Sequence, residues 1–131
     1  MNWDEELYSR AIEIVGTFPL NGFDGNSAGA VSCALRTKNG NIYTGICIDV
    51  ACSLGVCAEH AAVAEMLKAH ETEISAIIAV NEKRNILPPC GRCRELMFQV
   101  DRRNLRTQVI IGRNKTVTLD KLYSELWVEK F

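Results

Sequence analysis

The spacing of apolar positions changes along the chain, and each change predicts a different element. Apolar side chains recur three and four residues apart over residues 4–16, which is typical of an amphipathic helix. Two β-branched runs meet at Asn39-Gly40, a dipeptide that favours a hairpin turn. The continuous apolar run at 74–80 indicates a strand buried on both faces. The expected elements are helices at 4–16, 57–70, 93–100 and 120–127, and strands at 30–37, 41–48, 74–80, 107–112 and 115–119.

The order of these elements predicts an α/β fold, with one domain over residues 1–131. A hairpin comes first, and helical segments then precede the third and fourth strands, so we expect helical crossovers to reach those strands. The sheet is therefore expected to be mixed and five-stranded, with helices on both of its faces.

Composition and charge narrow the classes of function. Fifteen Lys and Arg residues against sixteen Asp and Glu residues leave a formal net charge of −1, which argues against nucleic-acid binding because phosphate-binding surfaces usually carry a basic excess. We interpret Arg102, Arg103 and Arg106 as a solvated helix end. The first ten residues are acidic and polar, and no apolar run approaches the ~18 residues of a membrane span, so neither a leader peptide nor a membrane segment is expected.

Six cysteines in such a chain predict a cytoplasmic, reducing location, where clustered thiols are more often metal ligands or catalysts than disulfides. Cys33 and Cys47 fall inside predicted strands, and we interpret both as small buried side chains. Cys57 opens one predicted helix, and Cys90 and Cys93 open the next. If the two helix starts lie side by side at one end of the sheet, the three thiols converge there.

Three thiolates predict a catalytic zinc site rather than a structural one, because a fourth tetrahedral position stays open to water. Zinc lowers the pKa of that water toward ~7. Glu59 lies two residues after Cys57, close enough to act on the water without binding the metal. A carboxylate in that place takes a proton from the water and returns it to a leaving amine. The Cys57–Glu59 segment and the Cys90–Cys93 pair are each weak evidence for such a site when taken alone. Together they are strong evidence for it.

The segments "CAEHAA" and "PCGRCR" resemble the two signatures of the cytidine deaminase family, and the resemblance runs from about residue 29 to the last helix. It implies a three-layer α/β/α sandwich, zinc held by Cys57, Cys90 and Cys93, and proton transfer by Glu59. It also implies a homotetramer whose active sites are completed by neighbouring subunits. The stretch "NEKRNILPPCGRCREL" is most similar to the free-nucleoside branch that includes blasticidin S deaminase.

The expected reaction is hydrolytic deamination of a 4-aminopyrimidine nucleoside or an analogue, of the cytidine, deoxycytidine or blasticidin S type. The resemblance implies that backbone groups at Ala58 and Pro89 orient the amine of the substrate. A zinc held by three thiolates carries a formal charge of −1, which nearby cations offset. The candidates are Arg92, Arg94 and His60, the last standing where many tetrameric members have an arginine.

The chain departs from the family pattern where the sugar and the base bind. Gly29 stands where the first strand usually carries an aromatic residue, Cys47 replaces a ribose-binding Asn, and Asp49 replaces a Glu. A thiol is a poor partner for a sugar hydroxyl, so the substrate-binding residues do not carry over with the reaction. Asp49 and Trp127 are the candidate substrate contacts that remain. Further candidates are Phe23, for stacking on the base, and Arg84, for binding a carboxylate-bearing substituent.

Two alternative functions remain open. Cys90-Gly-Arg-Cys93 can be a thioredoxin-like redox dithiol, but this leaves Cys57 and Glu59 without a role. A non-catalytic structural zinc module needs a fourth strong ligand, for which Cys52 and His60 are the candidates.

Overall fold

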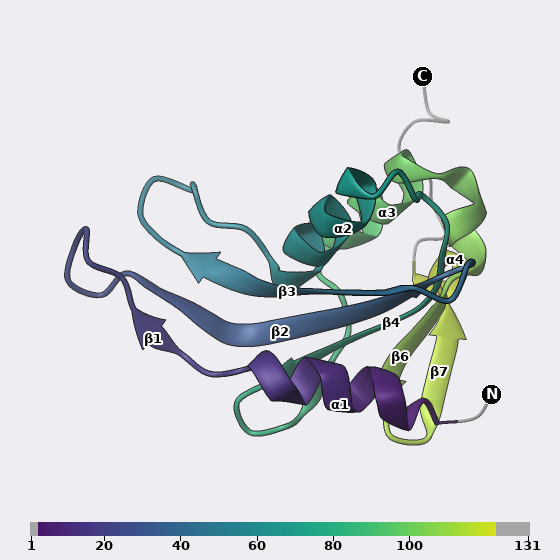
Figure 1. Cartoon of the computed structure of the whole chain (residues 1–131), viewed down its shortest axis with the longest axis horizontal. Coiled ribbons are helices and arrows are strands. Elements are labelled where there is room, and N and C mark those ends of the chain that lie inside the picture. Colours follow the sequence, from purple (N-terminus) through teal and green to yellow (C-terminus); the bar gives the residue numbers. More distant parts are fainter. Residues whose placement is uncertain (1–2, 123–131) are drawn as a thin grey trace.

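The computed structural model describes residues 3–122 and arranges them in three layers, with helices on both faces of one sheet (Figure 1). The helical elements are α1 (Glu5–Ile14), α2 (Ala58–Lys68), α3 (Gly91–Val100), the 3₁₀ helix η1 (Arg102–Arg106) and α4 (Leu119–Leu122). The strands are β1 (Phe18–Pro19), β2 (Ser27–Thr37), β3 (Ile42–Asp49), β4 (Ile74–Asn81), β5 (Ile86–Leu87), β6 (Gln108–Gly112) and β7 (Lys115–Thr118). The predicted fold class is confirmed.

The sheet is mixed, as expected, and it has seven strands rather than five. β2 pairs antiparallel with both β3 and β4, while β4 pairs parallel with β6, and β7 closes the far edge. The two additional strands, β1 and β5, are two-residue pairings on β2 and β4. Segments this short carry no alternation of apolar and polar positions, so the sequence pattern could not reveal them.

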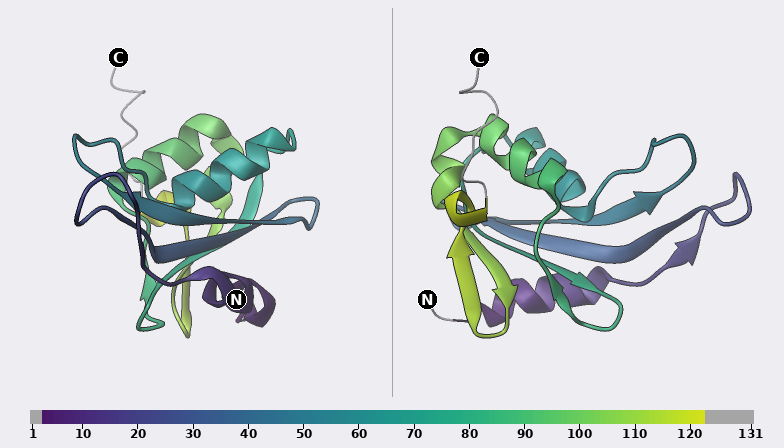
Figure 2. Two further views of the ribbon diagram at one scale, coloured as in Figure 1. Left: turned by 60° about the vertical axis from the view of Figure 1, so that its left-hand side comes forward. Right: turned by 180° about the vertical axis from the view of Figure 1, so that it is seen from behind.

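The two faces of the sheet bury separate clusters of side chains. α1 covers one face and packs Leu7 and Ala11 against Ala34, Ile78 and neighbouring strand residues. α2 and α3 lie side by side on the other face (Figure 2). Their buried cluster contains, among others, Cys33, Leu35, Ala62, Met66, Ile77, Met97 and Val109. Because Cys33 and Cys47 are both buried there, the interpretation of these two residues as small core side chains is confirmed.

A close contact between α2 and β3 determines where α2 begins. A Cβ atom at Gly45 would lie 2.4 Å from the backbone nitrogen of Ala62 and 2.7 Å from the carbonyl oxygen of Ala58. Only a glycine on β3 and small residues on α2 allow the two backbones to approach so closely. This contact places the first turn of α2, and with it Cys57, directly over the sheet.

A local hydrogen bond determines the start of α1, and the helix is shorter than the one predicted at 4–16 because the backbone is already extended at Val15. Asp4 caps the helix by accepting a hydrogen bond from the backbone nitrogen of Leu7 at 3.0 Å. Arg36 on β2 holds the same carboxylate at 3.0 Å and reaches Glu6 at 3.0 Å. These contacts join the start of α1 to the sheet.

The basic residues at 102–106 form η1, where Arg103 pairs with Asp101 at 2.8 Å and Glu73 at 3.2 Å. Within residues 3–122, no helix has both the length and the apolar character needed to cross a bilayer.

Candidate metal centre and pocket

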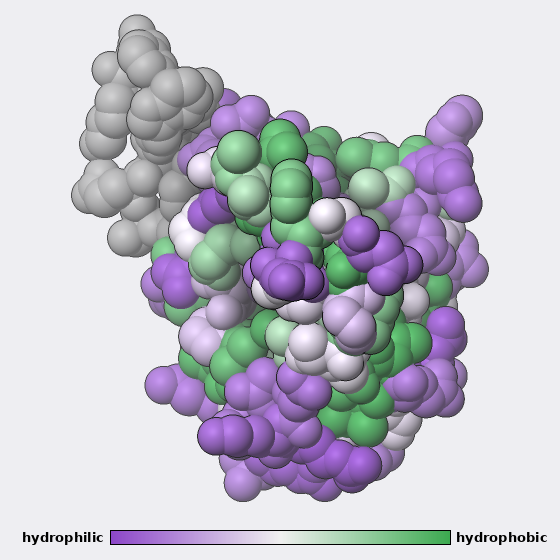
Figure 3. Space-filling model, turned by 90° about the vertical axis from the view of Figure 1, so that its left-hand side faces the viewer, coloured by the Kyte–Doolittle hydropathy of each residue, from purple (hydrophilic) through white to green (hydrophobic). Residues whose placement is uncertain are grey.

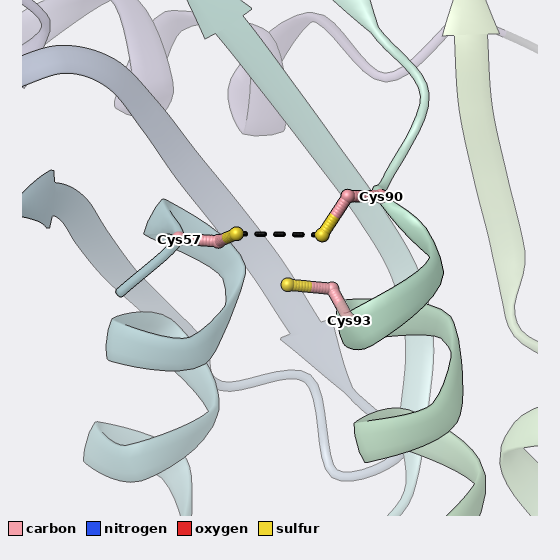
Figure 4. Close-up of side chains that lie close together, drawn as sticks. All are labelled: Cys57, Cys90 and Cys93. Atoms are coloured by element: carbon pink, nitrogen blue, oxygen red, sulfur yellow. Dashed lines mark hydrogen bonds between the residues drawn. The ribbon is translucent and has the colours of Figure 1, made fainter. Parts of the chain in front are cut away.

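Three cysteine thiols meet between the starts of α2 and α3 (Figure 4). Cys57 and Cys90 are the N-cap residues of the two helices, and Cys93 lies in the first turn of α3. The Cys57 and Cys90 sulfurs are 3.4 Å apart, and all three sulfurs lie within 4.8 Å of one another. The convergence predicted from the sequence is therefore present, and it comes from side chains 33 residues apart along the chain.

Cys57 and Cys90 are each placed by a backbone pairing just ahead of the helix that they begin. Before α2, Ile48 and Val56 exchange two backbone hydrogen bonds of 3.0 and 3.2 Å, which close the loop that leads to Cys57. Before α3, Leu87 pairs with Ala79 on β4, and two prolines then lead into Cys90. Neither Cys57 nor Cys90 caps its own helix with its side chain. The two thiols instead contact each other.

The thiol cluster fits zinc in both number and chemistry. Three cysteine sulfurs are soft donors that zinc binds in structural and catalytic sites, and three protein ligands leave one tetrahedral position open. Without a cation, burial and the neighbouring sulfur of Cys90 raise the pKa of Cys57, and burial also raises the pKa of Cys93. Burial acts in the same direction at Cys90, but backbone amides of Cys93 and Arg92 lower the pKa of that thiol. A divalent cation binds the thiolate forms and displaces their protons.

Glu59 stands next to the thiols without belonging to their group. It is the second residue of α2, is only 6% exposed, and lines the same pocket as Cys57 and Cys90. Burial raises the pKa of the Glu59 carboxyl above its ordinary value. The carboxylate is therefore placed at the inner end of the pocket, where little water reaches it.

The pocket has a volume of about 500 Å³, and Val50, Ser53, Gly55 and Val56 of the β3–α2 loop line it. Figure 3 views the molecule from the end at which this loop lies in Figure 1. By the inner end of the pocket we mean Ala58, Glu59 and the thiol group, of which Cys57 and Cys90 line the cavity, while Cys90 is exposed and Cys93 is buried. The inner end is faced by residues of β2 and β3, which we call the strand wall of the pocket: Ala30, Val31, Cys47 and Asp49. Hydrophobic and hydrophilic side chains are mixed over this face of the molecule, and Phe23 and Leu54 are 73% and 74% exposed.

The three cations that were candidates for offsetting the thiolate charge lie in different surroundings. Arg92 lines the pocket, and its Nη1 donates to the carbonyl of Gly55 at 3.5 Å. Arg94 instead donates to backbone carbonyls, at 2.8 Å to Pro89 and 3.0 Å to Leu122. His60 is half-buried, and among the described residues neither it nor Cys52 belongs to the thiol group.

The strand wall does not follow the family pattern described above. Gly29 is buried at an irregularity of β2 with φ +93°, and a Cβ there would lie 2.1 Å from the carbonyl oxygen of Gly16. This position therefore has no room for an aromatic side chain, and Ala30 and Val31 line the pocket instead. The Cys47 sulfur accepts a hydrogen bond from the Val31 backbone nitrogen at 3.3 Å and donates to Asp49 Oδ2 at 3.6 Å.

The other candidate substrate contacts are spread over the molecule. Pro89 is buried beside Glu59 in a small void behind the pocket, while Pro88 lines the pocket itself. Arg84 lines a separate cavity of about 400 Å³ with Tyr8 and Arg113. Phe23 is exposed and does not line the pocket, and Trp127 lies outside the described residues.

Sequence reasoning missed Val31 and Ser53 as pocket residues. Val31 gave no signal, because its contribution is a backbone N–H directed at a distant thiol. Ser53 and the preceding Cys52 both have positive φ, 58° and 63°, a strained conformation for non-glycine residues that a sequence does not reveal.

Comparisons with known proteins agree with this geometry. The family model described as "Cytidine and deoxycytidylate deaminase zinc-binding region" matches residues 1–109. Among curated relatives, a cytidine deaminase of Halalkalibacterium halodurans is 33% identical over 72 residues, covering 53% of this chain and 54% of that protein. A cytidine deaminase of Mycobacterium tuberculosis is 31% identical over 71 residues, covering 53% of each. The chain thus spans about half the length of the curated relatives it matches.

Solved structures show the same fold over most of the chain. Cytidine deaminase from Mycobacterium leprae superposes with a TM-score of 0.76 at 20% identity, covering 92% of this chain and 97% of that one. Cytidine deaminase from Bacillus anthracis gives a TM-score of 0.72 at 25% identity, covering 96% and 90%. The family match, the fold and the thiol group agree, and the chain belongs to the cytidine and deoxycytidylate deaminase family as a zinc-binding member.

Proposed function

We propose that this protein is a zinc-dependent hydrolytic deaminase of 4-aminopyrimidine nucleosides, which releases ammonia and leaves the uracil-type product. The observation that carries the proposal is the position of Glu59, a buried carboxylate that shares one pocket with two of the three converging thiols. A metal ligand set, a proton carrier beside it and a cavity of about 500 Å³ are the parts that hydrolytic deamination requires.

The roles of the residues follow from their places. Cys57, Cys90 and Cys93 hold the zinc, which when bound supplies Lewis-acid chemistry that makes hydroxide available near neutral pH. Glu59 accepts the proton lost by the attacking water and delivers it to the ring nitrogen of the substrate. The C4–O bond forms, and the carboxylate then takes the proton of the new C4 hydroxyl and gives it to the departing amine as the C4–N bond breaks and the C4=O double bond forms. One water is consumed for each ammonia released.

Neighbouring residues position this chemistry. Arg92 is the cation we propose to offset the charge of the thiolates, because it lines the pocket between two of the ligands. Arg94 has a different role, since its hydrogen bond to the Pro89 carbonyl holds the segment that enters α3. Backbone groups at Ala58 and Pro89 orient the amine, and Asp49 contacts the appended group. His60 and Trp127 stay candidates for charge support and pocket closure.

Finer features of the proposal rest on the sequence and the surface. The similarity of "NEKRNILPPCGRCREL" to the blasticidin S branch supports nucleoside analogues as substrates. Exposed Phe23 and Leu54, on two loops at the same end of the molecule, support assembly into a homotetramer, because large apolar side chains on a surface often mark interfaces. All six cysteines are free, which supports a reducing, cytoplasmic location. The partner is a small nucleoside-like molecule rather than a nucleic acid.

The test is ammonia release by the zinc-loaded protein from cytidine, deoxycytidine and blasticidin S, with the Glu59→Gln variant as the blank. Turnover of cytidine or deoxycytidine supports a nucleoside deaminase, and turnover of blasticidin S alone supports an antibiotic-inactivating enzyme. No ammonia from any of the three, with zinc bound and the fold intact, contradicts the proposal.

A further inference from the structure

A second cavity, of about 400 Å³, lies on the side of the sheet that α1 covers, and we call it the α1 cavity. Because β4 and β6 are parallel, the turns that follow them lie at the same edge of the sheet, along which α1 runs (Figure 1). These two turns and α1 enclose the cavity. Its lining residues are Tyr8, Arg84, Asn85, Ile86, Gly112 and Arg113, and none of them lines the pocket that holds Glu59.

The short strand β5 separates the α1 cavity from the pocket. Ile86 and Leu87 are neighbours on this strand, so their side chains point to opposite faces of the sheet. Ile86 packs against the cluster beneath α1 and lines the α1 cavity, whereas Leu87 lines the pocket. The α1 cavity is therefore a site of its own rather than an extension of the pocket.

Arg84 brings a guanidinium without a protein partner to the α1 cavity. Within residues 3–122, its side chain forms no hydrogen bond, ion pair or ring contact. The turn that carries it is held by Asn81, whose Oδ1 accepts the backbone N–H groups of Lys83 and Asn85, both at 3.0 Å. Arg84 itself has a φ of 65°, a strained conformation for a residue with a long side chain. A fixed turn thus holds a charged group that no contact within the fold requires.

Arg113 supplies a second guanidinium, whose position is fixed by aromatic rings. Its Cζ lies 4.5 Å from the centroid of the Trp3 ring and 5.5 Å from that of Tyr8. Its ion pair with Glu5 is long, at 3.9 Å, and both side chains are mostly exposed, so the pair is weak. Contacts with ring faces do not neutralise the charge, and Arg113 therefore still attracts an anion.

The two turns are basic although the whole chain has a net charge of −1. Residues 81–85 and 112–115 contain one acidic side chain, Glu82, and four basic ones: Lys83, Arg84, Arg113 and Lys115. The Glu82 carboxylate accepts the backbone N–H of Thr17 at 3.2 Å, so it is already engaged with the segment after α1. An excess of positive charge with two guanidiniums at one cavity favours a doubly charged anion over a singly charged one.

We propose that the α1 cavity is a binding site for a phosphate group, held by Arg84 and Arg113 and separate from the deaminase pocket. A guanidinium binds phosphate oxygens through paired N–H donors, which an unpartnered Arg84 offers. The cavity is larger than a phosphate ion, and Tyr8 and Ile86 provide a ring and an aliphatic side chain beside the arginines. The ligand is therefore inorganic phosphate or a small organic phosphate. This inference goes beyond the proposed deaminase function and does not depend on it.

The experiment is calorimetric titration of the zinc-loaded protein with inorganic phosphate, phenyl phosphate and benzoate, at low ionic strength because salt screens exposed charges. Both phosphates should bind with a Kd of about 1 mM or tighter, and benzoate, with one negative charge, at least about tenfold more weakly. Arg84→Gln should weaken phosphate binding at least about tenfold, and Arg84→Gln/Arg113→Gln should abolish it. Tighter binding of phenyl phosphate than of phosphate identifies an organic phosphate as the ligand, and equal or weaker binding identifies the ion itself.

Two matched controls each remove one positive charge. Lys83→Gln alters the same turn without touching the α1 cavity, and Arg92→Gln removes the cation of the pocket. Each should change the affinity for phosphate less than about threefold, because neither residue contacts the bound group. Circular dichroism and thermal unfolding check that every variant is folded.

Four results would overturn the inference. The first is the absence of phosphate binding by the wild type, and the second is benzoate binding as tight as that of the phosphates. The third is an affinity that Arg84→Gln leaves unchanged or that Arg92→Gln abolishes, since phosphate would then bind in the pocket. The fourth is equal weakening by Lys83→Gln and Arg84→Gln, which would show attraction to the charge of the turn without a site.

Discussion

The inner end of the pocket and its strand wall are built in different ways. At the inner end, Cys57, Cys90, Cys93 and Glu59 all lie within the first turns of two helices, and their spacing follows the family signatures. The strand wall consists of residues from β2 and β3 that meet only because the strands pair. In the proposed function, the first region holds the reacting groups and the second meets the variable part of the substrate.

In the proposed function, this difference separates the residues that carry the reaction from those that bind the variable part of the substrate. The thiols and Glu59 depend on one another, because zinc needs all three ligands and the proton carrier must stand beside them. At the strand wall, Cys47 and Asp49 form a separate hydrogen-bonded pair that does not touch the thiol group among the described residues. Changes at the wall therefore alter binding without disturbing the metal ligands.

The largest effect is expected from Cys90→Ala, which leaves two ligands for zinc. Metal binding and activity should both be lost, and the thermal midpoint should fall because metal binding is linked to folding. Zinc content measured by mass spectrometry, together with thermal unfolding, checks this. Cys52→Ser is the control, since Cys52 is exposed and outside the thiol group. Loss of zinc from the control would show that Cys52 is a fourth ligand and that the site is structural.

Glu59→Gln should retain zinc and fold but lower kcat by about 10⁴-fold, the upper range for removal of a general acid–base. Gln keeps the size of the side chain and cannot carry the proton. Steady-state ammonia release and zinc content from one preparation give both quantities. Near-normal turnover would remove Glu59 from the mechanism and leave the thiol group without its proton carrier.

Gly45→Ala tests whether the inner end depends on the contact between α2 and β3. The added methyl group would lie 2.4 Å from the Ala62 nitrogen, so α2 must shift. We expect the free energy of unfolding to fall by about 2–3 kcal/mol, with weaker zinc binding. Gly22→Ala, whose Cβ meets no atom closer than 4.0 Å, should change stability by less than about 0.5 kcal/mol in denaturant titrations. Equal stability of the two variants would contradict the packing argument.

The smallest effect concerns Glu71, which joins the end of α2 to the far end of the β2–β3 hairpin. Hydrogen bonds from Tyr43 at 2.6 Å, Asn41 at 2.9 Å and Asn39 at 3.1 Å lower the pKa of the Glu71 carboxyl to about 2. Because the folded pKa lies below the ordinary 4.5, the carboxylate stabilises the fold above pH 4.5, and this contribution is lost as the pH falls toward 2.

Thermal midpoints of the wild type and Glu71→Gln, measured from pH 6 to pH 3, check this. The difference between the two proteins should shrink as the pH falls. Metal affinity near neutral pH should be almost equal in both, since Glu71 lies outside the pocket. A constant difference over this range would show that the ionisation of Glu71 does not contribute.

Much of the fold could be predicted because its elements carry strong local patterns. The hairpin around Asn39-Gly40, the Ala-rich helix α2 and the buried strands β4 and β6 all agree with the structure. β1 and β5 could not be predicted, since two-residue pairings depend on partners elsewhere in the sheet. The same limit applies at Gly29, whose conformation follows from its contact with the Gly16 backbone.

For the site, the sequence by itself determined that three thiols and Glu59 stand at the starts of two helices, because a position at a helix start depends on neighbouring residues along the chain. The tertiary structure alone decided that the Cys47 thiol contacts Val31 and Asp49, and that Gly29 lies outside the pocket. The physical reason is the origin of the contacts. Helix-start geometry comes from neighbours along the chain, whereas the strand wall comes from pairings and bulges between strands that a sequence pattern does not specify.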